Sequence, residues 1–117
     1  MKKVLIIGLL LMGLAGLSAQ ESKELDGVAY MVIEPYVFDF NAATGKVNIG
    51  ERYVVDDTIY VVNGDRLRLN EIANCLLILT APYKHEHGDM AVVTVYFEVV
   101  GRFGAMMEAR VVKIVRN

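Results

Sequence analysis

The strongest constraint on the fold is a strict alternation of apolar and polar residues toward the C-terminus. Between residues 90 and 100 the apolar side chains of Val93, Val95, Phe97 and Val99 alternate with Thr94, Tyr96 and Glu98. Successive side chains of a β-strand point to opposite faces, so this pattern predicts a strand with one face on an apolar core. A second apolar series follows a turn at residues 101–104 and comprises Met107, Ala109, Val111 and Val115. The two stretches together predict an antiparallel C-terminal hairpin.

Strand-forming residues dominate the rest of the chain from residue 28 onward. Short runs rich in Val, Ile, Tyr, Phe and Thr are separated by Gly, Asn and Asp, which is typical of strands and turns. The candidate strands, some of which we expect to merge, are residues 28–33, 36–40, 46–49, 52–55, 58–62, 66–69, 76–80, 91–100 and 106–115. Because 55% of the residues are apolar and no linker or repeat is visible, we predict one all-β domain over residues 28–117. Its expected form is a small antiparallel sandwich or barrel of about 7–8 strands.

One stretch fits two structures. Four side chains recur at helical spacing, namely Leu69, Ile72, Leu76 and Leu79, whereas residues 76–80 alone are typical of a buried strand. A short helix near residues 69–76, between a three-stranded meander and the closing hairpin, gives the element order of an OB-fold barrel. Without that helix a sandwich is the simpler outcome, and both alternatives stay open at this point.

The pair Asn63-Gly64 predicts a second hairpin, because both residues tolerate the positive φ that tight turns require. A three-residue loop, over residues 62–64 or 63–65, puts Ile59, Val61, Leu67 and Leu69 on one face of the strands. A two-residue Asn63-Gly64 loop mixes these apolar side chains with arginines. We therefore expect the three-residue loop, since a slip of one residue turns the apolar set toward water.

The N-terminus carries the features of an export signal. Lys2 and Lys3 precede an apolar run over residues 4–17, and the small residues Ser18 and Ala19 follow. This run is shorter than the roughly 20 residues that span a bilayer, so we expect cleavage after Ala19 and no permanent membrane anchor. The predicted organisation is a signal peptide at residues 1–19, a flexible lead-in at 20–27 and the β-domain. The expected destination is the periplasm, the cell surface or the exterior.

Charge argues against nucleic acid as a partner. Cleavage removes two lysines, which leaves 10 basic against 14 acidic side chains and a formal charge of −4. Proteins that bind nucleic acid meet its phosphates with clustered Lys and Arg. The only locally basic stretch is at the C-terminus, with Arg102, Arg110, Lys113 and Arg116, and we interpret it as a solvated strand face.

The most conspicuous polar cluster is His85-Glu86-His87-Gly88-Asp89. In an extended segment His85, His87 and Asp89 project to the same side and offer three donors to a metal ion. A structural zinc site needs a fourth ligand, and Cys75 and Met90 are the only soft candidates. The competing interpretation is an exposed polar loop between two apolar strands.

Other candidate residues have structural interpretations beside functional ones. Cys75 lies among apolar residues, which indicates a small buried hydrophobe more than a nucleophile or an interchain disulfide. Tyr36, Phe38 and Phe40 form a row at period two, which suits a core face of a strand or the stacking of a ligand ring. Asp56 and Asp57 indicate a turn or a strand edge. Asp57-Thr58-Ile59 resembles the O-glycosylation acceptor motif of exported proteins in some bacteria.

Missing motifs decide the expected function. Ser22 is the only serine after the leader, and neither a phosphate-binding loop nor a dinucleotide fingerprint is present, so we expect no enzyme and no cofactor. The sequence thus predicts an exported, non-enzymatic binding module whose protein or cell-envelope partner docks on an edge strand or a loop end. Self-association into a homo-oligomer is compatible with Val-rich edges. The alternatives are a periplasmic metal-binding protein that uses His85, His87 and Asp89, and a small barrel with an apolar ligand inside.

Overall fold

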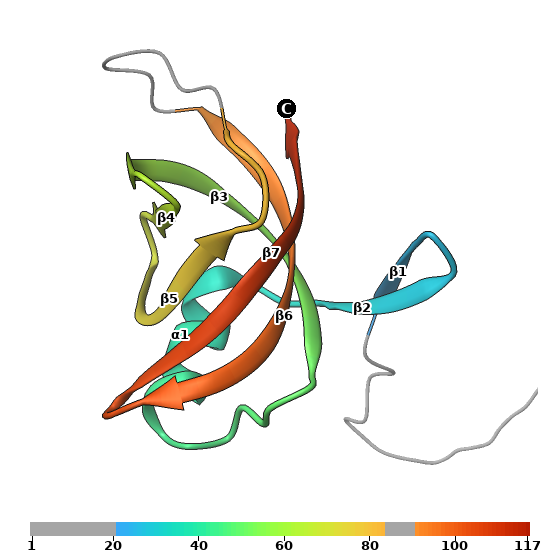
Figure 1. The fold of residues 1–117 in the computed structure, drawn as a ribbon. Coiled ribbons are helices and arrows are strands. Elements are labelled where there is room, and N and C mark those ends of the chain that lie inside the picture. The colour runs from blue at the N-terminus through green and yellow to red at the C-terminus, as the bar shows by residue number, and fades with distance from the viewer. Residues whose placement is uncertain (1–20, 84–90) are drawn as a thin grey trace, which may run out of the picture.

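The computed structural model describes residues 21–83 and 91–117 and shows a β-barrel with one short helix (Figure 1). The elements are β1 Ser22–Leu25, β2 Val28–Val32, α1 Pro35–Ala43, β3 Arg52–Asn63, β4 Arg66–Leu69, β5 Ile72–Leu79, β6 Val92–Phe103 and β7 Met106–Arg116. The sheet order is β1-β2-β3-β4-β5-β7-β6, and β6 pairs back onto β3. Five strands, β3 to β7, therefore form a closed barrel, with β1 and β2 outside it. The predicted all-β class is confirmed.

The helix stands in a different place from the one that the OB-like alternative requires. Residues 69–76 contain a turn and the start of β5, so the alternative of a helix there is wrong. Leu69 and Ile72 pair across that turn, and both are buried, which explains why their apolar spacing imitates a helix. The actual helix α1 lies before the first barrel strand. The five-stranded barrel itself has the architecture of an OB-fold, in which β5 and β7 pair in parallel.

The prediction of a strand at residues 36–40 is wrong because these residues form α1. Pro35 occupies its first turn, where a missing N–H costs nothing. Phe38 is fully buried, while Tyr36 and Phe40 are 61% and 62% exposed, so only the central member of the aromatic row belongs to the core. The candidate strand at 46–49 is also wrong, since these residues form an irregular connection.

The predicted C-terminal hairpin is present, but its turn is Gly104-Ala105, between the paired residues Phe103 and Met106, and not residues 101–104 as expected, because β6 extends to Phe103. The four predicted core residues of β6 are at most 1% exposed. In β7 an irregularity opposite Tyr96 and Phe97 changes the alternation of the strand. Ile114 therefore packs against the core, whereas Val115, which was expected to do so, is exposed.

The β3–β4 hairpin has a two-residue loop, so the expected three-residue loop is wrong. Asn63 pairs with Arg66, and Gly64 lies between them with a φ of 63°. A positive φ at the first loop position is what a type II′ turn requires. A bulge between Ile59 and Val61 inserts one residue and restores the burial of Ile59, Leu67 and Leu69, while Val61 faces solvent.

The predicted strands 52–55 and 58–62 merge into β3. Asp56 and Asp57 lie inside this strand and point to opposite faces, so their interpretation as a turn is wrong. At these two residues β3 pairs with β6 only, which agrees with the alternative of a strand edge. Asp57 is buried because its carboxylate accepts backbone N–H groups from Thr58 at 2.7 Å and Glu71 at 2.9 Å. Asp56 is exposed and accepts the hydroxyl of Thr94 at 2.5 Å. The two carboxylates thus have separate structural partners.

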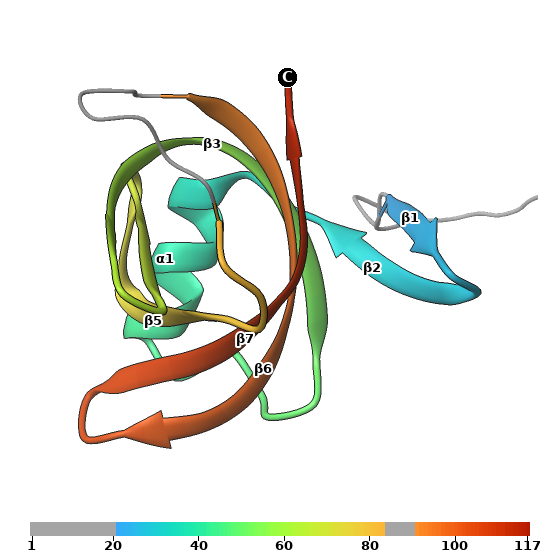
Figure 2. The same ribbon diagram turned by 45° about the horizontal axis from the view of Figure 1, so that its top comes forward.

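The barrel interior is filled with apolar side chains. The largest side chains with less than 2% exposure are Phe38, Phe97, Ile59, Leu67, Leu77, Met107, Val55, Val93, Val95 and Val99. Phe38 of α1 contacts Tyr53 and Phe97 edge-on, with ring centroids 5.0 and 5.1 Å apart. Figure 2 shows α1 framed by the curved strands of the barrel. The helix thereby completes the core of the barrel.

A polar contact attaches α1 to β5. Leu67 pairs with Leu77 and Leu69 with Ile72, so the β4–β5 ladder is interrupted between these pairs. Asp39 of α1 accepts the N–H groups of Ala73 and Asn74 at 2.8 and 2.7 Å, within this interruption. Backbone donors that leave a ladder need another acceptor, and the Asp39 carboxylate provides it.

The strands β1 and β2 form a hairpin that projects from the barrel, and we call this hairpin the arm (Figures 1 and 2). The segment expected as a flexible lead-in thus includes a paired strand, β1. Asp26 and Gly27 both have positive φ, as a two-residue type I′ turn requires. The arm joins β3 through a short parallel pairing at Met31 and Val32. Tyr30 is buried and meets Tyr96 of β6 edge-on, with ring centroids 5.3 Å apart.

Candidate functional site

The residues of the predicted metal site, His85, His87 and Asp89, lie outside the described residues. The metal site therefore stays a prediction. Over residues 21–83 and 91–117, no group of three or more His, Cys, Asp or Glu side chains is arranged to hold a metal ion.

Cys75 has the environment of a structural residue. It is 6% exposed and belongs to the core cluster. Burial, followed by the negative charges of Asp39 and Glu108, raises the pKa of the Cys75 thiol to about 12. A thiol that stays protonated at neutral pH and cannot be reached from solvent is a poor nucleophile and a poor partner for an interchain disulfide.

The resemblance to a glycosylation motif falls on the middle of β3. Thr58 is half-buried, and its neighbours Asp57 and Ile59 are both buried. Thr58 pairs with Val92 of β6, and its carbonyl accepts the N–H of Asn70 at 2.9 Å. A modifying enzyme needs an accessible segment, and these three residues are held in the sheet on both sides.

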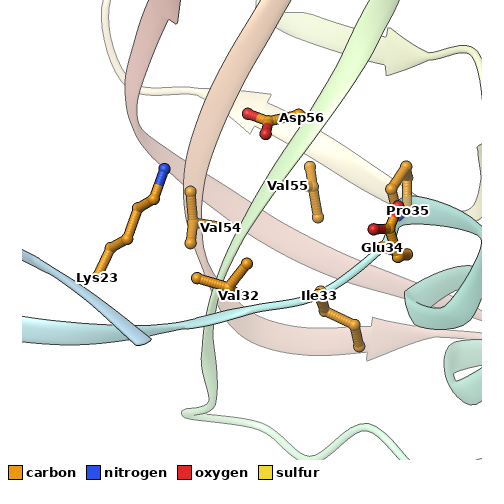
Figure 3. A pocket seen from close by; sticks show the side chains of 8 residues that line it. All are labelled: Lys23, Val32, Ile33, Glu34, Pro35, Val54, Val55 and Asp56. Carbon is orange, nitrogen blue, oxygen red and sulfur yellow. The ribbon is translucent and has the colours of Figure 1, made fainter. Parts of the chain in front are cut away.

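A small crease separates the arm from the barrel (Figure 3). It has a volume of about 60 Å³ and is lined by Lys23, Val32, Ile33, Glu34, Pro35, Val54, Val55 and Asp56. The charged side chains come from β1, β3 and the connection between β2 and α1, while Val32, Ile33, Pro35, Val54 and Val55 form the apolar part. This volume admits a few water molecules, whereas pockets for small-molecule ligands have volumes of ~300–1,000 Å³. The crease is therefore too small for a substrate.

A larger hollow lies where β5 ends, and we call it the end groove. One part has a volume of about 300 Å³ and is lined by Gly64, Asp65, Leu79, Thr80, Ala81 and Pro82. A second part, of about 170 Å³, shares residues 79–82 and extends to Tyr83 and to residues 111–114 of β7. The two parts are adjacent because they share residues 79–82. Their combined lining is mostly apolar, and the groove is wide enough for side chains of another polypeptide.

One side of the end groove is an unpaired strand edge. The parallel ladder between β5 and β7 ends at Leu79 and Val111, where the hydroxyl of Thr80 donates to the carbonyl of Val111 at 2.8 Å. Beyond this point, among the described strands, β7 pairs with β6 only. We call residues 112–115 of β7 the open edge. β7 continues past the end of β5 because β5 is the shorter of the two strands.

The hydrogen-bond pattern shows which backbone groups face outward on the open edge. The N–H of Asn117 donates to the carbonyl of Val92 at 3.0 Å, so Asn117 faces β6. Groups in an antiparallel pair face each other at alternate positions, which assigns Val115 and Lys113 to the β6 side as well. The backbone N–H and carbonyl of Ile114 therefore point away from β6, toward the side on which the β5 ladder has ended.

The side chains of the open edge divide into two faces. Ile114 packs against the core cluster on the inner face, next to the end groove. Lys113 and Val115 are exposed on the outer face. Lys113 takes part in none of the ion pairs found among the described residues. The open edge thus combines an apolar inner face with a positive charge outside.

No family model, no curated protein and no solved structure matches this chain. Within the part of the chain that the structure describes, no helix is long and apolar enough to cross a bilayer.

Proposed function

We propose that this protein is an exported, non-enzymatic binding module that takes up an extended polypeptide segment as an additional strand on the open edge. The observation that carries the proposal is the end of the β5 ladder at Val111, beyond which residues 112–115 of β7 pair, among the described strands, with β6 only. Addition of a strand to such an edge satisfies backbone groups and gives affinity, and adjacent pockets give specificity.

The end groove supports this mode of binding. It lies beside the open edge and is lined by Leu79, Ala81 and Pro82, which suit apolar side chains. Ile114 presents its backbone groups toward the incoming segment. Other strands also have stretches paired on one side only, such as β6 beyond its pairing with β3 and the outer side of β1, but neither of these stretches lines the end groove.

The other function classes have less support. The barrel interior holds fully buried side chains such as Phe97 and Leu77, which argues against an apolar ligand inside it. An enzyme needs an accessible nucleophile or an acid–base pair, and Cys75 is buried.

Export is expected from residues 1–19, and the intact mass of the protein isolated from its native cells tests this expectation. The expected chain starts at Gln20, and one that still starts at Met1 contradicts export.

The binding mode is tested with peptides. Eight-residue peptides displayed on phage are selected against the purified protein, and the amides perturbed by the selected peptides are identified by NMR. We expect shifts at residues 79–82 and 112–115. Ile114→Pro removes the outward N–H without removing a β6–β7 hydrogen bond, so it should abolish binding.

The matched control is Ile114→Ala, which shortens the same side chain and keeps the N–H. It should retain most of the affinity, and the amide spectra of both variants check that the barrel is intact. Selection of no peptide, or shifts confined to the exposed Tyr36 and Phe40 of α1, would overturn the proposal.

A further inference from the structure

We infer that the tip of the β6–β7 hairpin is a membrane-contact site that inserts reversibly into the surface of a lipid bilayer. We call Phe103, Gly104, Ala105 and Met106 the hairpin tip. It lies at the opposite end of β7 from the open edge, so this inference does not rest on the proposed function. It follows from the composition of the hairpin tip, its exposure and its position outside the barrel wall.

The geometry of the turn does not require apolar residues. The structure describes four hairpins with two-residue turns, and three of these turns carry a carboxylate, namely Asp26, Asp65 and Glu71. The fourth turn is Gly104-Ala105. Its glycine has the same φ of 63° as the glycine before Asp65, so the position of Ala105 accepts a polar side chain equally well. An apolar turn at this place therefore needs a reason other than backbone conformation.

The two large side chains of the hairpin tip are presented to solvent. Phe103 is 77% exposed, the highest value among the large apolar side chains of the described residues, and Met106 is 38% exposed. These two residues pair directly across the turn, so their side chains lie on the same face of the hairpin. Together they form one apolar surface that gains free energy when it leaves water.

The hairpin tip projects past the barrel wall (Figures 1 and 2). β3 pairs with β6 as far as Glu98, and β5 pairs with β7 only from Met107 onward. Among the described strands, Phe103 and Met106 therefore pair only with each other. Because backbone groups bond across the hairpin, entry into the headgroup region leaves few of them without a partner.

The connection before β3 places further apolar surface at the same end of the barrel. The N–H of Gly50 donates to the carbonyl of Val99 at 2.8 Å, which puts Ile49 beside the base of the hairpin. Ile49 is 65% exposed, and Val100, at the base itself, is 41% exposed. A bilayer that receives the hairpin tip thus meets apolar side chains behind it.

The size of the hairpin tip favours a bilayer over a protein as its partner. A stable protein interface buries about 800 Å² on each partner, and a four-residue turn with two large side chains offers far less. Membrane binding scales with the apolar area that enters the bilayer and needs only a few side chains. Arg102 is the only charged residue between positions 99 and 107, and its long side chain keeps the guanidinium among the headgroups while the tip inserts.

Tryptophan fluorescence tests the contact directly, because the chain contains no tryptophan. Phe103→Trp places a single fluorophore at the hairpin tip. Vesicles of phosphatidylcholine should shift its emission to shorter wavelengths, and lipids brominated near the headgroup should quench it. Tyr60→Trp is the matched control, since Tyr60 is 62% exposed and lies toward the other end of β3. Its emission should not change.

Cosedimentation with the same vesicles measures the affinity. Phe103→Ser should lower the partition into vesicles about tenfold, whereas Tyr60→Ser should leave it unchanged. Binding of the wild type should persist at high salt, because salt does not screen apolar contacts.

Several outcomes would overturn the inference. These are an unchanged emission of the Phe103→Trp variant, an equal shift in the Tyr60→Trp variant, and binding only to vesicles that contain phosphatidylglycerol and only at low salt. A shift that depends on protein concentration without vesicles would identify a second copy as the partner and would also overturn it. None of these variants alters the open edge, so the peptide experiment and the vesicle experiment can fail independently.

Discussion

The barrel interior and the junction between the arm and the barrel both use aromatic contacts, but they differ in how many of these contacts they contain. In the interior, Phe38, Tyr53 and Phe97 come from three elements and contact one another, with centroid distances from 5.0 to 6.0 Å. The arm rests on one such contact, between Tyr30 and Tyr96. Tyr30 and Val54 are buried, yet neither belongs to the core cluster of the barrel.

This difference predicts two levels of stability in one small domain. Each interior ring is held by neighbours from several strands, so that its loss affects the whole barrel. The arm has a short parallel pairing to β3 and a single aromatic anchor, with exposed charged side chains around the crease. Regions with few buried contacts open locally at low free energy. We therefore expect the arm to open without unfolding of the barrel.

Removal of an interior ring should have the largest effect. Phe97→Ala leaves a cavity between α1, β3 and β6, and we expect it to lower the free energy of unfolding by about 3–5 kcal/mol. The control is Val100→Ala on the same strand, where the side chain is 41% exposed and the expected change is within about 0.5 kcal/mol. Urea denaturation measures both. Similar losses in the two variants would contradict the assignment of the core.

The regions of the molecule also differ in how far their structure can be predicted from the sequence. Strands with clear alternation, such as β6, were predicted together with their buried face, because burial on one side imposes a period of two. The row Tyr36, Phe38 and Phe40 shows the same period, yet it is helical, with one ring buried and two exposed. Pro35 was the available signal, since proline is favoured in the first turn of a helix.

The register of the β3–β4 hairpin and the open edge of β7 were harder to predict from the sequence. The bulge beside Ile59 has no local signature, so the parity argument gave a loop that was one residue too long. The basic residues Lys113 and Arg116 were recognised, but the open edge was not. It arises because β5 ends earlier than its parallel neighbour β7, and the ends of a ladder depend on pairing between distant segments. His85, His87 and Asp89 remain a sequence prediction.

The link between α1 and β5 should have the second-largest effect. Asp39→Ala removes the acceptor of two backbone N–H groups, those of Ala73 and Asn74. Loss of this acceptor should cost about 1–3 kcal/mol. Asp39→Asn keeps a carbonyl oxygen at the same position and should retain part of the stability. An Asn variant as unstable as the Ala variant would show that the charge, and not the acceptor geometry, is what matters.

A change at the arm anchor tests the comparison directly. Tyr30→Ala removes the ring that meets Tyr96, so amides of β1 and β2 should lose protection from hydrogen exchange. The free energy of unfolding of the barrel should fall by about 1 kcal/mol or less, because the interior is unchanged. Tyr30→Phe keeps the ring contact and serves as the control. Equal loss of protection in β6 and in the arm would indicate a single cooperative unit.

The smallest effect is expected at Glu51, which orders the connection before β3. Its carboxylate accepts the N–H of Asn48 at 2.8 Å and the hydroxyl of Tyr53 at 2.7 Å. Burial alone raises the pKa of Glu51, but these hydrogen bonds favour the charged form, and the net result is a pKa below the ordinary 4.5. A carboxylate whose pKa is lower in the folded protein stabilises the fold above about pH 4.5, and this contribution disappears as the pH falls through the folded-state pKa.

The difference in free energy of unfolding between the wild type and Glu51→Gln should therefore shrink below pH 4.5. Urea denaturation between pH 7 and pH 3 measures it, and a difference that grows on acidification would contradict the assigned direction. Because Tyr53 also contacts Phe38 and Phe97, a measurable effect would show that the connection before β3 is coupled to the aromatic contacts of the barrel interior.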